Sequence, residues 1–478
     1  MRYTRIFLIN PFYKGARVKV VFSAGLGYIT EALKTAGFEY DVLDMSLGYP
    51  YKILKKKIAE FNPDLIGVSM MTYRYKDTYN LIAKIKGDFP EVKIVTGGPH
   101  ISLFREKVLE ECPYIDFGVV LEGEETIIEL CKGEPLNSIK GLIYRDGNRV
   151  VYNGDRPFIK DLDSIPFPKY EKFELDKSFN KRINALPIVS SRGCPFNCIY
   201  CPVKSSIGEV FRARSPENIL QELTYWYERG YRIFSFADDN FTLLKERVYK
   251  ICELIKKAGF KDLRLSCDNG IRADRVDKPL LETMRNAGFY RIALGVEAGN
   301  DKVLKALKKQ EKIEIIKRVI QDACSLGYEV DLFFLVGSPQ EEWADLEDSF
   351  KIAYQNGGVS YFYNIIPFPN TELFYWIEKY GRFLRNPEDY LNEYPVLDNK
   401  PLFETPQMPY KLRKKALRKA FLISRRTMRQ SWQKRLSKLG FWGKALSFVY
   451  TTKFVQDVLL RISILRKAIY KLAYTFIS

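Results

Sequence analysis

Three cysteines lie close together in the segment SRGCPFNCIYC, which spans residues 191–201. Cys194, Cys198 and Cys201 are separated by gaps of three and two residues, so one loop could place three thiolates around one face of an iron–sulfur cubane. Three protein ligands leave one iron free to bind a small chelating molecule, whereas a structural cluster or zinc site normally uses four. Zinc ligation by histidine is nearly excluded, because His100 is the only histidine of the chain. The segment therefore predicts a cluster with one open iron.

The remaining five cysteines are scattered singly through apolar or helical stretches, and we expect them to be small buried hydrophobic residues in a reducing cytoplasm. They are Cys112, Cys131, Cys252, Cys267 and Cys324.

Other residues suited to chemistry follow predicted β-strands between residues 187 and 369. Six apolar runs alternate there with helical segments: PIVSSRG, IFSFAD, LRLSCDN, YRIALGVEAG, VDLFFLVG and SYFYNIIPF. Six strand–helix units predict a partial (β/α)6 barrel. Catalytic groups of parallel barrels gather at the C-terminal strand ends. The residues at or near these ends are Cys194, Asp238, Asp239, Arg272, Glu297 and Gly337.

Residues 1–150 also alternate strands and helices, with nearly continuous apolar runs such as RIFLINPF and DLIGVSMM. Such runs are typical of parallel strands covered on both faces, and predict an α/β fold with an open, doubly wound sheet. Ligands of such sheets bind at the carboxyl ends of the strands. The loops at these ends are residues 10–24, 69–75, 97–100 and 122–125.

The predicted organisation has four parts. The doubly wound domain covers residues 1–150, and a hairpin followed by an extended linker covers 151–186, which is rich in turn-forming residues. The barrel follows at 187–385, and a helical, basic region at 386–478.

The motif CPFNCIYC resembles the CxxxCxxC signature of the radical S-adenosylmethionine (SAM) superfamily. In that family the open iron chelates SAM, and an electron from the [4Fe–4S] cluster cleaves SAM to a 5′-deoxyadenosyl radical that abstracts hydrogen from an unactivated carbon. The resemblance implies that several further residues contact SAM. These are Tyr200 beside the adenine, Asp238 and Asp239 near the amino group, Arg272 and Glu297 near the ribose and carboxylate, and Gly337 near the adenine. Either aspartate alone could instead cap the next helix.

The front region resembles the cobalamin-binding domain that precedes the barrel in one radical SAM subgroup, the class B methyltransferase-like enzymes. The matching pieces are GLGYITEAL, DLIGVSMMT, VTGGPHIS and VLEGEET, and they imply cobalamin contacts by Ser69, Gly97, Gly98, His100 and Gly123. The loop INPFYKGARVKVVFSAG lacks the histidine that ligates cobalt in many cobalamin carriers, so the resemblance implies His-off binding. For His100, a hydrogen bond to the backbone in its loop is the other interpretation. A flavodoxin-like domain without any cofactor would show the same pattern.

With both cofactors, the resemblance implies a methyltransferase that acts on an unactivated carbon of a hydrophobic, lipid-like or pigment-like small molecule. Its electron donor would be a carrier such as flavodoxin or ferredoxin. A cyclase or oxidoreductase without methyl transfer remains open, as does an enzyme of nucleic-acid modification. A sensor without activity would leave the residues at the strand ends unexplained.

The formal net charge of +18 is concentrated at the C-terminus, where residues 410–478 contain eighteen Lys and Arg and one acid, Asp457. Cations interleaved with aromatic residues are typical of helices that lie in a membrane interface, for which Trp432, Trp442, Tyr450 and Tyr470 are suitable anchors. Packing on the barrel with a solvated cationic face is the second interpretation, and nucleic acid is the least favoured partner. The N-terminus has no signal-peptide pattern, so we expect a cytoplasmic protein, peripheral on the inner face of the cell membrane if the tail binds lipid.

Overall fold

The computed structural model describes residues 2–11, 23–181, 185–355, 357–393, 395–396 and 400–452. Its front domain contains a seven-stranded sheet in the order β2-β1-β3-β4-β5-β6-β7. The strands are β1 (Arg5–Asn10), β2 (Glu39–Asp44), β3 (Leu65–Ser69), β4 (Lys93–Gly97), β5 (Phe117–Val119), β6 (Leu142–Asp146) and β7 (Arg149–Tyr152). The first five pair in parallel, whereas β6 and β7 form an antiparallel hairpin that extends the sheet.

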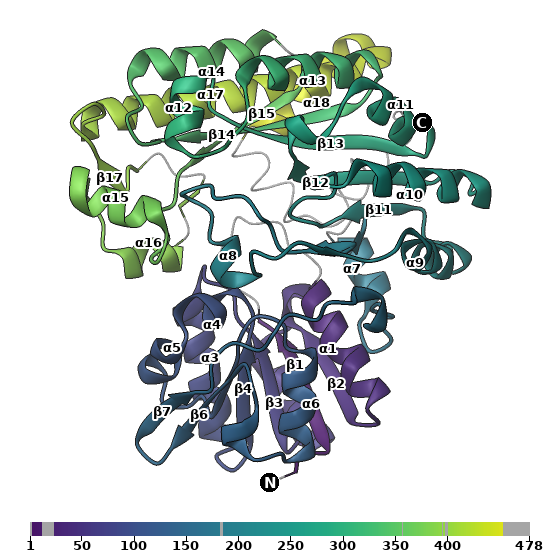
Figure 1. Cartoon of the computed structure of the whole chain (residues 1–478), viewed down its shortest axis with the longest axis vertical. Helices are drawn as coiled ribbons and strands as arrows, with labels where there is room; N and C mark the ends of the chain where they lie inside the picture. The colour runs from purple at the N-terminus through teal and green to yellow at the C-terminus, as the bar shows by residue number, and fades with distance from the viewer. Residues whose placement is uncertain are drawn as a thin grey trace.

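Helices cover both faces of this sheet, as the continuous apolar strands predict (Figure 1). One face packs against α1 (Ala24–Thr35) and α6 (Glu124–Lys132). The other packs against α2 (Tyr51–Phe61), α3 (Tyr75–Asp88), α4 (Pro99–Phe104) and α5 (Glu106–Glu111). The predicted doubly wound domain is confirmed.

The second sheet has six strands in the order β15-β14-β13-β12-β11-β8, all parallel. In chain order they are β8 (Leu186–Ile188), β11 (Ile233–Phe236), β12 (Arg264–Ile271), β13 (Phe289–Glu297), β14 (Glu329–Val336) and β15 (Val359–Asn364). The helices between them are α9 (Pro216–Glu228), α10 (Lys245–Ala258), α11 (Lys278–Asn286), α12 (Asp301–Ala306), α13 (Ile313–Ser325) and α14 (Trp343–Gln355). All six predicted barrel strands are confirmed. Each strand pairs in the sheet with the strands that precede and follow it in the order of the chain.

The cysteine motif lies in a long excursion after the first barrel strand. This excursion begins at β9 (Ser191–Arg192), passes through α8 (Val203–Ser206) and returns at β10 (Arg212–Ala213), which pairs antiparallel with β9. In Figure 1, α8 lies between the barrel and the front domain, so the motif is close to the boundary of the two domains. The short linker helix α7 (Leu175–Lys181) precedes β8.

The C-terminal region is mainly helical, as predicted, and contains one small sheet. Its helices are α15 (Glu372–Tyr380), α16 (Pro387–Glu393), α17 (Tyr410–Arg435) and α18 (Gly440–Thr451), and β16 (Arg382–Phe383) pairs with β17 (Phe403–Glu404). Five single 3-10 turns complete the described elements: η1 (Met45–Leu47), η2 (Leu136–Ser138), η3 (Leu162–Ser164), η4 (Ala273–Arg275) and η5 (Ser437–Leu439).

Helix α17 covers the open edge of the barrel sheet. The backbone N–H of Ser360 donates to the Thr427 hydroxyl at 3.1 Å, and that of Phe362 donates to the Ser424 hydroxyl at 3.0 Å. An uncovered edge strand would present these N–H groups for pairing with another chain. The first part of the basic tail is therefore packed on the barrel, whereas α18 leaves Phe441 and Trp442 largely exposed. None of the helices in the described ranges is long and apolar enough to cross a membrane.

Candidate active site

The three motif cysteines lie together near the carboxyl end of the barrel sheet. Burial raises the pKa of all three thiols, that of Cys201 to about 12, while the cations of Lys309 and Arg272 act to lower the pKa of Cys198. Nearby cations favour thiolates, the form that binds iron. Among the described residues, no three Cys, His, Asp or Glu side chains converge tightly enough to share a single metal ion. A cubane binds each thiolate through a different iron and needs no such convergence.

A buried ionic network surrounds this loop. The Lys309 ammonium lies 3.0 Å from the Glu297 carboxylate and 3.4 Å from that of Glu311, which lies 3.9 Å from the Arg272 guanidinium. Burial acts to lower the pKa of Lys309, but the two carboxylates together raise it above its usual range. The Arg272 guanidinium also packs 3.6 Å from the centre of the Phe196 ring. The network thus holds the cysteine loop against the ends of β12 and β13.

Glu297 and Tyr200 belong to the same group of side chains. Glu297 has a left-handed backbone, with φ of 61°, which is uncommon for a residue other than glycine and is frequent at functional sites. The Tyr200 hydroxyl is hydrogen-bonded to Glu297, and burial raises its pKa well above the usual range. The strained glutamate therefore faces the cysteine motif.

The two adjacent aspartates have different environments. Asp238 is buried, and its carboxylate accepts hydrogen bonds from the backbone N–H groups of Ser190 at 2.6 Å and Ser191 at 3.0 Å, and from the Ser190 hydroxyl. Asp239 has no hydrogen-bond or ion-pair partner among the described residues. Burial, and then the charge of Asp238, raises its pKa to about 6, and it lies near the charges of the cysteines. The structure thus leaves Asp239 available to a ligand, whereas Asp238 fixes the backbone before the motif.

Gly337 lies apart from this group. Its backbone N–H donates to the Glu341 carboxylate at 2.7 Å, and a side chain at this position would clash with the Arg413 guanidinium of α17. Burial raises the pKa of Glu341 to about 7 and lowers that of Arg413 to about 10. Gly337 thus packs against the C-terminal helix, and its contact with adenine stays a prediction.

Some of the predicted cobalamin residues lie at the open edge of the front sheet, whereas others lie in packed regions. Ser69 and Gly97 are paired neighbours at the carboxyl ends of β3 and β4, and both are partly exposed. Among the described residues, a side chain on Gly97 would meet only one atom within 4 Å, the Val119 carbonyl oxygen at 3.9 Å, so their side chains leave room for a bulky group near this backbone. Gly98 has φ of 109°, which favours glycine. Most of the loop 10–24, residues 12–22, lies outside the described residues.

Gly123 and His100 lie in packed regions of the front domain, and their contacts with cobalamin stay predictions. A side chain on Gly123 would crowd Val119 and Ile29. His100 is 2% exposed and stacks on the Tyr75 ring, with centroids 4.5 Å apart. Its Nε2 atom lies 3.3 Å from the Tyr79 hydroxyl, and burial lowers its pKa to about 3. Burial therefore keeps the His100 ring in its neutral form, and His-off binding stays a prediction.

Ion pairs that the sequence did not reveal connect the two domains at this site. Glu122, after β5, pairs with Arg192 at 3.0 Å and with Arg212 at 2.8 Å, and Glu124 pairs with Arg192 at 2.6 Å. Burial acts to raise the pKa of Glu124, but the Arg192 charge lowers it overall. Arg192 stands two residues before Cys194, so the contact joins the predicted cobalamin edge to the cysteine loop. Glu122, Glu124 and Arg192 lie in segments that the sequence singled out, but their pairing across the domains, like Lys309 and Glu311, was not predicted.

Fold and site together define a class of enzyme: a radical SAM-type barrel preceded by a cobalamin-type domain. Residues 188–353 match the model of the radical SAM superfamily, and residues 15–131 match the B12 binding domain. The chain is 31% identical, over 391 residues, to an uncharacterized methyltransferase of Pyrococcus horikoshii, covering 78% of this chain and 83% of that protein. The chain therefore belongs to the radical SAM superfamily, in its group with a B12-binding domain.

Other relatives are consistent with this assignment. An anaerobic magnesium-protoporphyrin IX monomethyl ester cyclase of Cereibacter sphaeroides is 28% identical over 77% of this chain and 63% of its own length. TsrM from Kitasatospora setae, a radical SAM methyltransferase solved with cobalamin and a [4Fe–4S] cluster, has a TM-score of 0.67 and 18% identity, covering 79% of this chain and 75% of that one. OxsB, solved with aqua-cobalamin and SAM, has a TM-score of 0.70 and 19% identity over 96% of this chain and 71% of its own.

The two structures establish the likeness of fold, and the family matches confirm the class of enzyme. The cluster, SAM and cobalamin expected from the sequence are the cofactors that these families and neighbours share.

Proposed function

We propose that this protein is a cobalamin-dependent radical SAM methyltransferase that methylates an unactivated carbon of a hydrophobic, lipid-like or pigment-like molecule. The observation that carries the proposal is the contact of Glu122 with Arg192 and Arg212, which apposes the carboxyl edge of the front sheet to the cysteine loop of the barrel. A group can pass between two cofactors only when both are held close together in a fixed orientation.

The residues present fit both cofactors. Cys194, Cys198 and Cys201 would hold the cluster. A [4Fe–4S] cluster with an open iron supplies one electron to SAM, and cobalamin supplies a cobalt that carries a methyl group. Asp239, which has no partner among the described residues, offers a carboxyl beside the cysteines that could accept hydrogen bonds from an amino group. Ser69 and Gly97 leave an open backbone edge that a corrin ring could approach.

The inner face of the barrel supports a hydrophobic substrate. Phe334 and Phe362 stack on each other with centroids 4.6 Å apart, and Phe362 packs on Phe350 of α14, so these two strand residues face outward. Successive strand residues point to opposite faces, so Phe333, Tyr361 and Tyr363 face inward. Their rings form a continuous aromatic group, with Phe333 5.7 Å from Tyr363 and 6.0 Å from Tyr361. Such a surface suits a flat aromatic molecule, and the Arg291–Asp331 ion pair lies beside Tyr361 on the same face.

The finer proposal of membrane association rests on α18 alone. Phe441, Trp442 and Phe448 are 77%, 71% and 54% exposed, and Lys444 is exposed on the same helix. Exposed aromatic residues beside cations are typical of helices that bind anionic lipid surfaces. Residues 453–478, including Tyr470, and the side chain of Tyr450 lie outside the described residues.

The test uses protein reconstituted without oxygen with iron, sulfide and hydroxocobalamin, given SAM with a deuterated methyl group. The substrate source is a lipid and pigment extract from a strain that lacks the gene. We expect one S-adenosylhomocysteine and one 5′-deoxyadenosine for each labelled product. Formation of 5′-deoxyadenosine without S-adenosylhomocysteine would instead favour a cyclase or oxidoreductase, the activity named for the Cereibacter relative. Absence of both with every extract would refute the proposal.

A further inference from the structure

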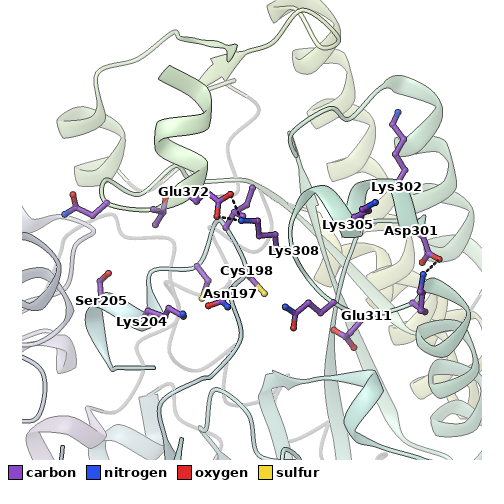
Figure 2. A pocket seen from close by; sticks show the side chains of 16 residues that line it. Asn197, Cys198, Lys204, Ser205, Asp301, Lys302, Lys305, Lys308, Glu311 and Glu372 are labelled. Atoms are coloured by element: carbon purple, nitrogen blue, oxygen red, sulfur yellow. Dashed lines mark hydrogen bonds and ion pairs between the residues drawn. The ribbon is translucent and has the colours of Figure 1, made fainter. Parts of the chain in front are cut away.

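A pocket of about 910 Å³ lies beside the cysteine motif, and the start of α15 forms part of its wall (Figure 2). Figure 2 shows Glu372 of α15 next to the loop that carries Cys198. The backbone N–H of Leu373 donates to the Ile199 carbonyl oxygen of this loop at 3.0 Å. The segment that follows β15 is therefore attached to the cysteine motif.

The same segment reaches the front domain at two points. We call residues 370–393, which comprise α15, β16 and α16, the bridging segment. Near its start, the side-chain amide of Asn370 donates to the Leu103 carbonyl oxygen of α4 at 3.4 Å. At its end, Asn392 of α16 accepts hydrogen bonds from the first turn of α3. The bridging segment thus contacts the cysteine loop and the front domain at once.

Asn392 supplies a cap that α3 cannot provide for itself. Arg74, the N-cap residue of α3, has no side-chain oxygen that could accept a hydrogen bond. Its backbone N–H donates to the Asn392 carbonyl oxygen at 2.7 Å, and the N–H of Lys76 donates to the Asn392 Oδ1 atom at 3.1 Å. Lys76 is the second residue of the helix, a position at which a capping oxygen normally binds. Arg74 is left-handed, with φ of 60°, a conformation that persists in such a residue only when its surroundings hold it.

The start of α3 is connected to the predicted cobalamin edge. Residues 70–74 join α3 to β3, which ends at Ser69. The backbone N–H of Met70 donates to the Gly97 carbonyl oxygen at 2.8 Å, and the Met70 carbonyl oxygen accepts from the N–H of His100 at 3.2 Å. Ser69 and Gly97 form the edge proposed above to leave room for a corrin ring. A shift at the start of α3 would therefore move the backbone that the corrin approaches.

We propose that Asn392 is a positioning residue for cobalamin: it fixes residues 70–74 and so holds the open edge of the front sheet in the form that binds the corrin. The inference rests on the proposed function, because it requires cobalamin at this edge. When only a fraction of the molecules has the competent loop, the measured affinity falls by that fraction. Because the bridging segment is also bonded to the cysteine loop, Asn392 sets the corrin edge relative to the cluster.

The test measures hydroxocobalamin binding by absorption titration of the full-length protein with its cluster reconstituted. Asn392→Leu removes the accepting side-chain oxygen, and Asn392→Asp keeps one. The control is Asp277→Ala, which removes a cap on the barrel, where the Asp277 carboxylate accepts from the N–H of Leu280 in α11 at 3.0 Å. We expect the Kd of Asn392→Leu to be about 5-fold higher than that of wild type, and those of Asn392→Asp and the control to stay within about 2-fold, from the usual effect of losing a cap.

Two further readouts distinguish positioning from a general structural role. Hydrogen exchange of the amides of residues 70–79 should be faster in Asn392→Leu than in wild type, and bound hydroxocobalamin should slow it. The content of bound iron and sulfide should be equal in wild type and all three variants. Equal Kd values for wild type and Asn392→Leu would overturn the positioning role, and so would equal losses of affinity in Asn392→Leu and Asp277→Ala, or loss of iron together with the corrin. A wild-type protein that binds no hydroxocobalamin would overturn the proposed function, and the role of Asn392 with it.

Discussion

The substitution His100→Phe tests whether His100 is a buried core residue or a ligand of the cofactor. The ring lies between Tyr75 and Phe104, with centroids 4.5 and 4.7 Å away, so phenylalanine suits the cavity. Burial, with a smaller effect of the Lys107 charge, lowers the histidine pKa from 6.5 to about 3. The folded protein therefore keeps the ring neutral at pH values at which the unfolded chain protonates it.

The sign of the effect follows from proton binding. Between pH 6.5 and pH 3 the unfolded chain binds more protons than the folded one, so stability falls as the pH falls through this window. A folded pKa of about 3 against 6.5 lowers the free energy of unfolding by about 2 kcal/mol between pH 7 and pH 5. His100→Phe removes this contribution, and should be less sensitive to acid than wild type by the same amount.

The assay is urea unfolding followed by circular dichroism at pH 7, 6 and 5 on both proteins. The difference in free energy of unfolding between wild type and His100→Phe isolates the histidine, because the carboxylates titrate equally in both proteins. In parallel, electron paramagnetic resonance of bound cob(II)alamin reports on a nitrogen ligand to cobalt. Identical pH dependence of the two proteins would refute the buried neutral ring, and a nitrogen splitting that disappears in the variant would refute His-off binding.

Three further predictions address the site and the tail. Cys198→Ala should lose the bound iron and sulfide and all 5′-deoxyadenosine formation while still binding hydroxocobalamin, and loss of corrin binding would contradict the division of the site between domains. Glu122→Gln should lower the free energy of urea unfolding by about 3 kcal/mol, since it leaves the 6%-exposed Arg212 side chain without its carboxylate. The control Glu125→Gln, which removes an exposed carboxylate paired with Arg156, should cost less than about 1 kcal/mol, and equal losses would refute the domain contact. Changing Phe441, Trp442 and Phe448 together to Ser should reduce flotation with anionic vesicles, and unchanged flotation would exclude α18 as the lipid contact.

The cysteine motif and both sheets could be predicted from the sequence because their signals are local. Ligand spacing depends on neighbouring residues, and the alternation of apolar strands with helices dictates parallel sheets. The same locality explains why the adjacent aspartates could not be told apart. Asp238 and Asp239 follow the same strand, and only the position of Ser190, in the loop after β8, decides which carboxylate is already hydrogen-bonded.

The C-terminal helix shows a second limit of sequence reasoning. Buried residues of α17 recur along one stripe, namely Ala416, Leu417, Ala420, Ile423 and Thr427. A stripe of this kind indicates that one side of the helix is covered, but not what covers it. Here the partner is the free edge of β15, through hydrogen bonds from Ser360 and Phe362 that leave no trace in hydrophobic periodicity.

The contact between the domains connects these observations to the proposed reaction. Methyl transfer between two cofactors tolerates little misplacement, because an error of about 1 Å can cost about 100-fold in rate. A flexible linker alone could not hold the domains so closely, whereas buried ion pairs resist separation, since parting them would leave charges without partners. Arg192 is the residue best placed to transmit this constraint, because it pairs with Glu122 and Glu124 of the front domain and stands two residues before Cys194. A shift of the front domain would therefore displace the cluster loop itself, so that both cofactors would move as one unit.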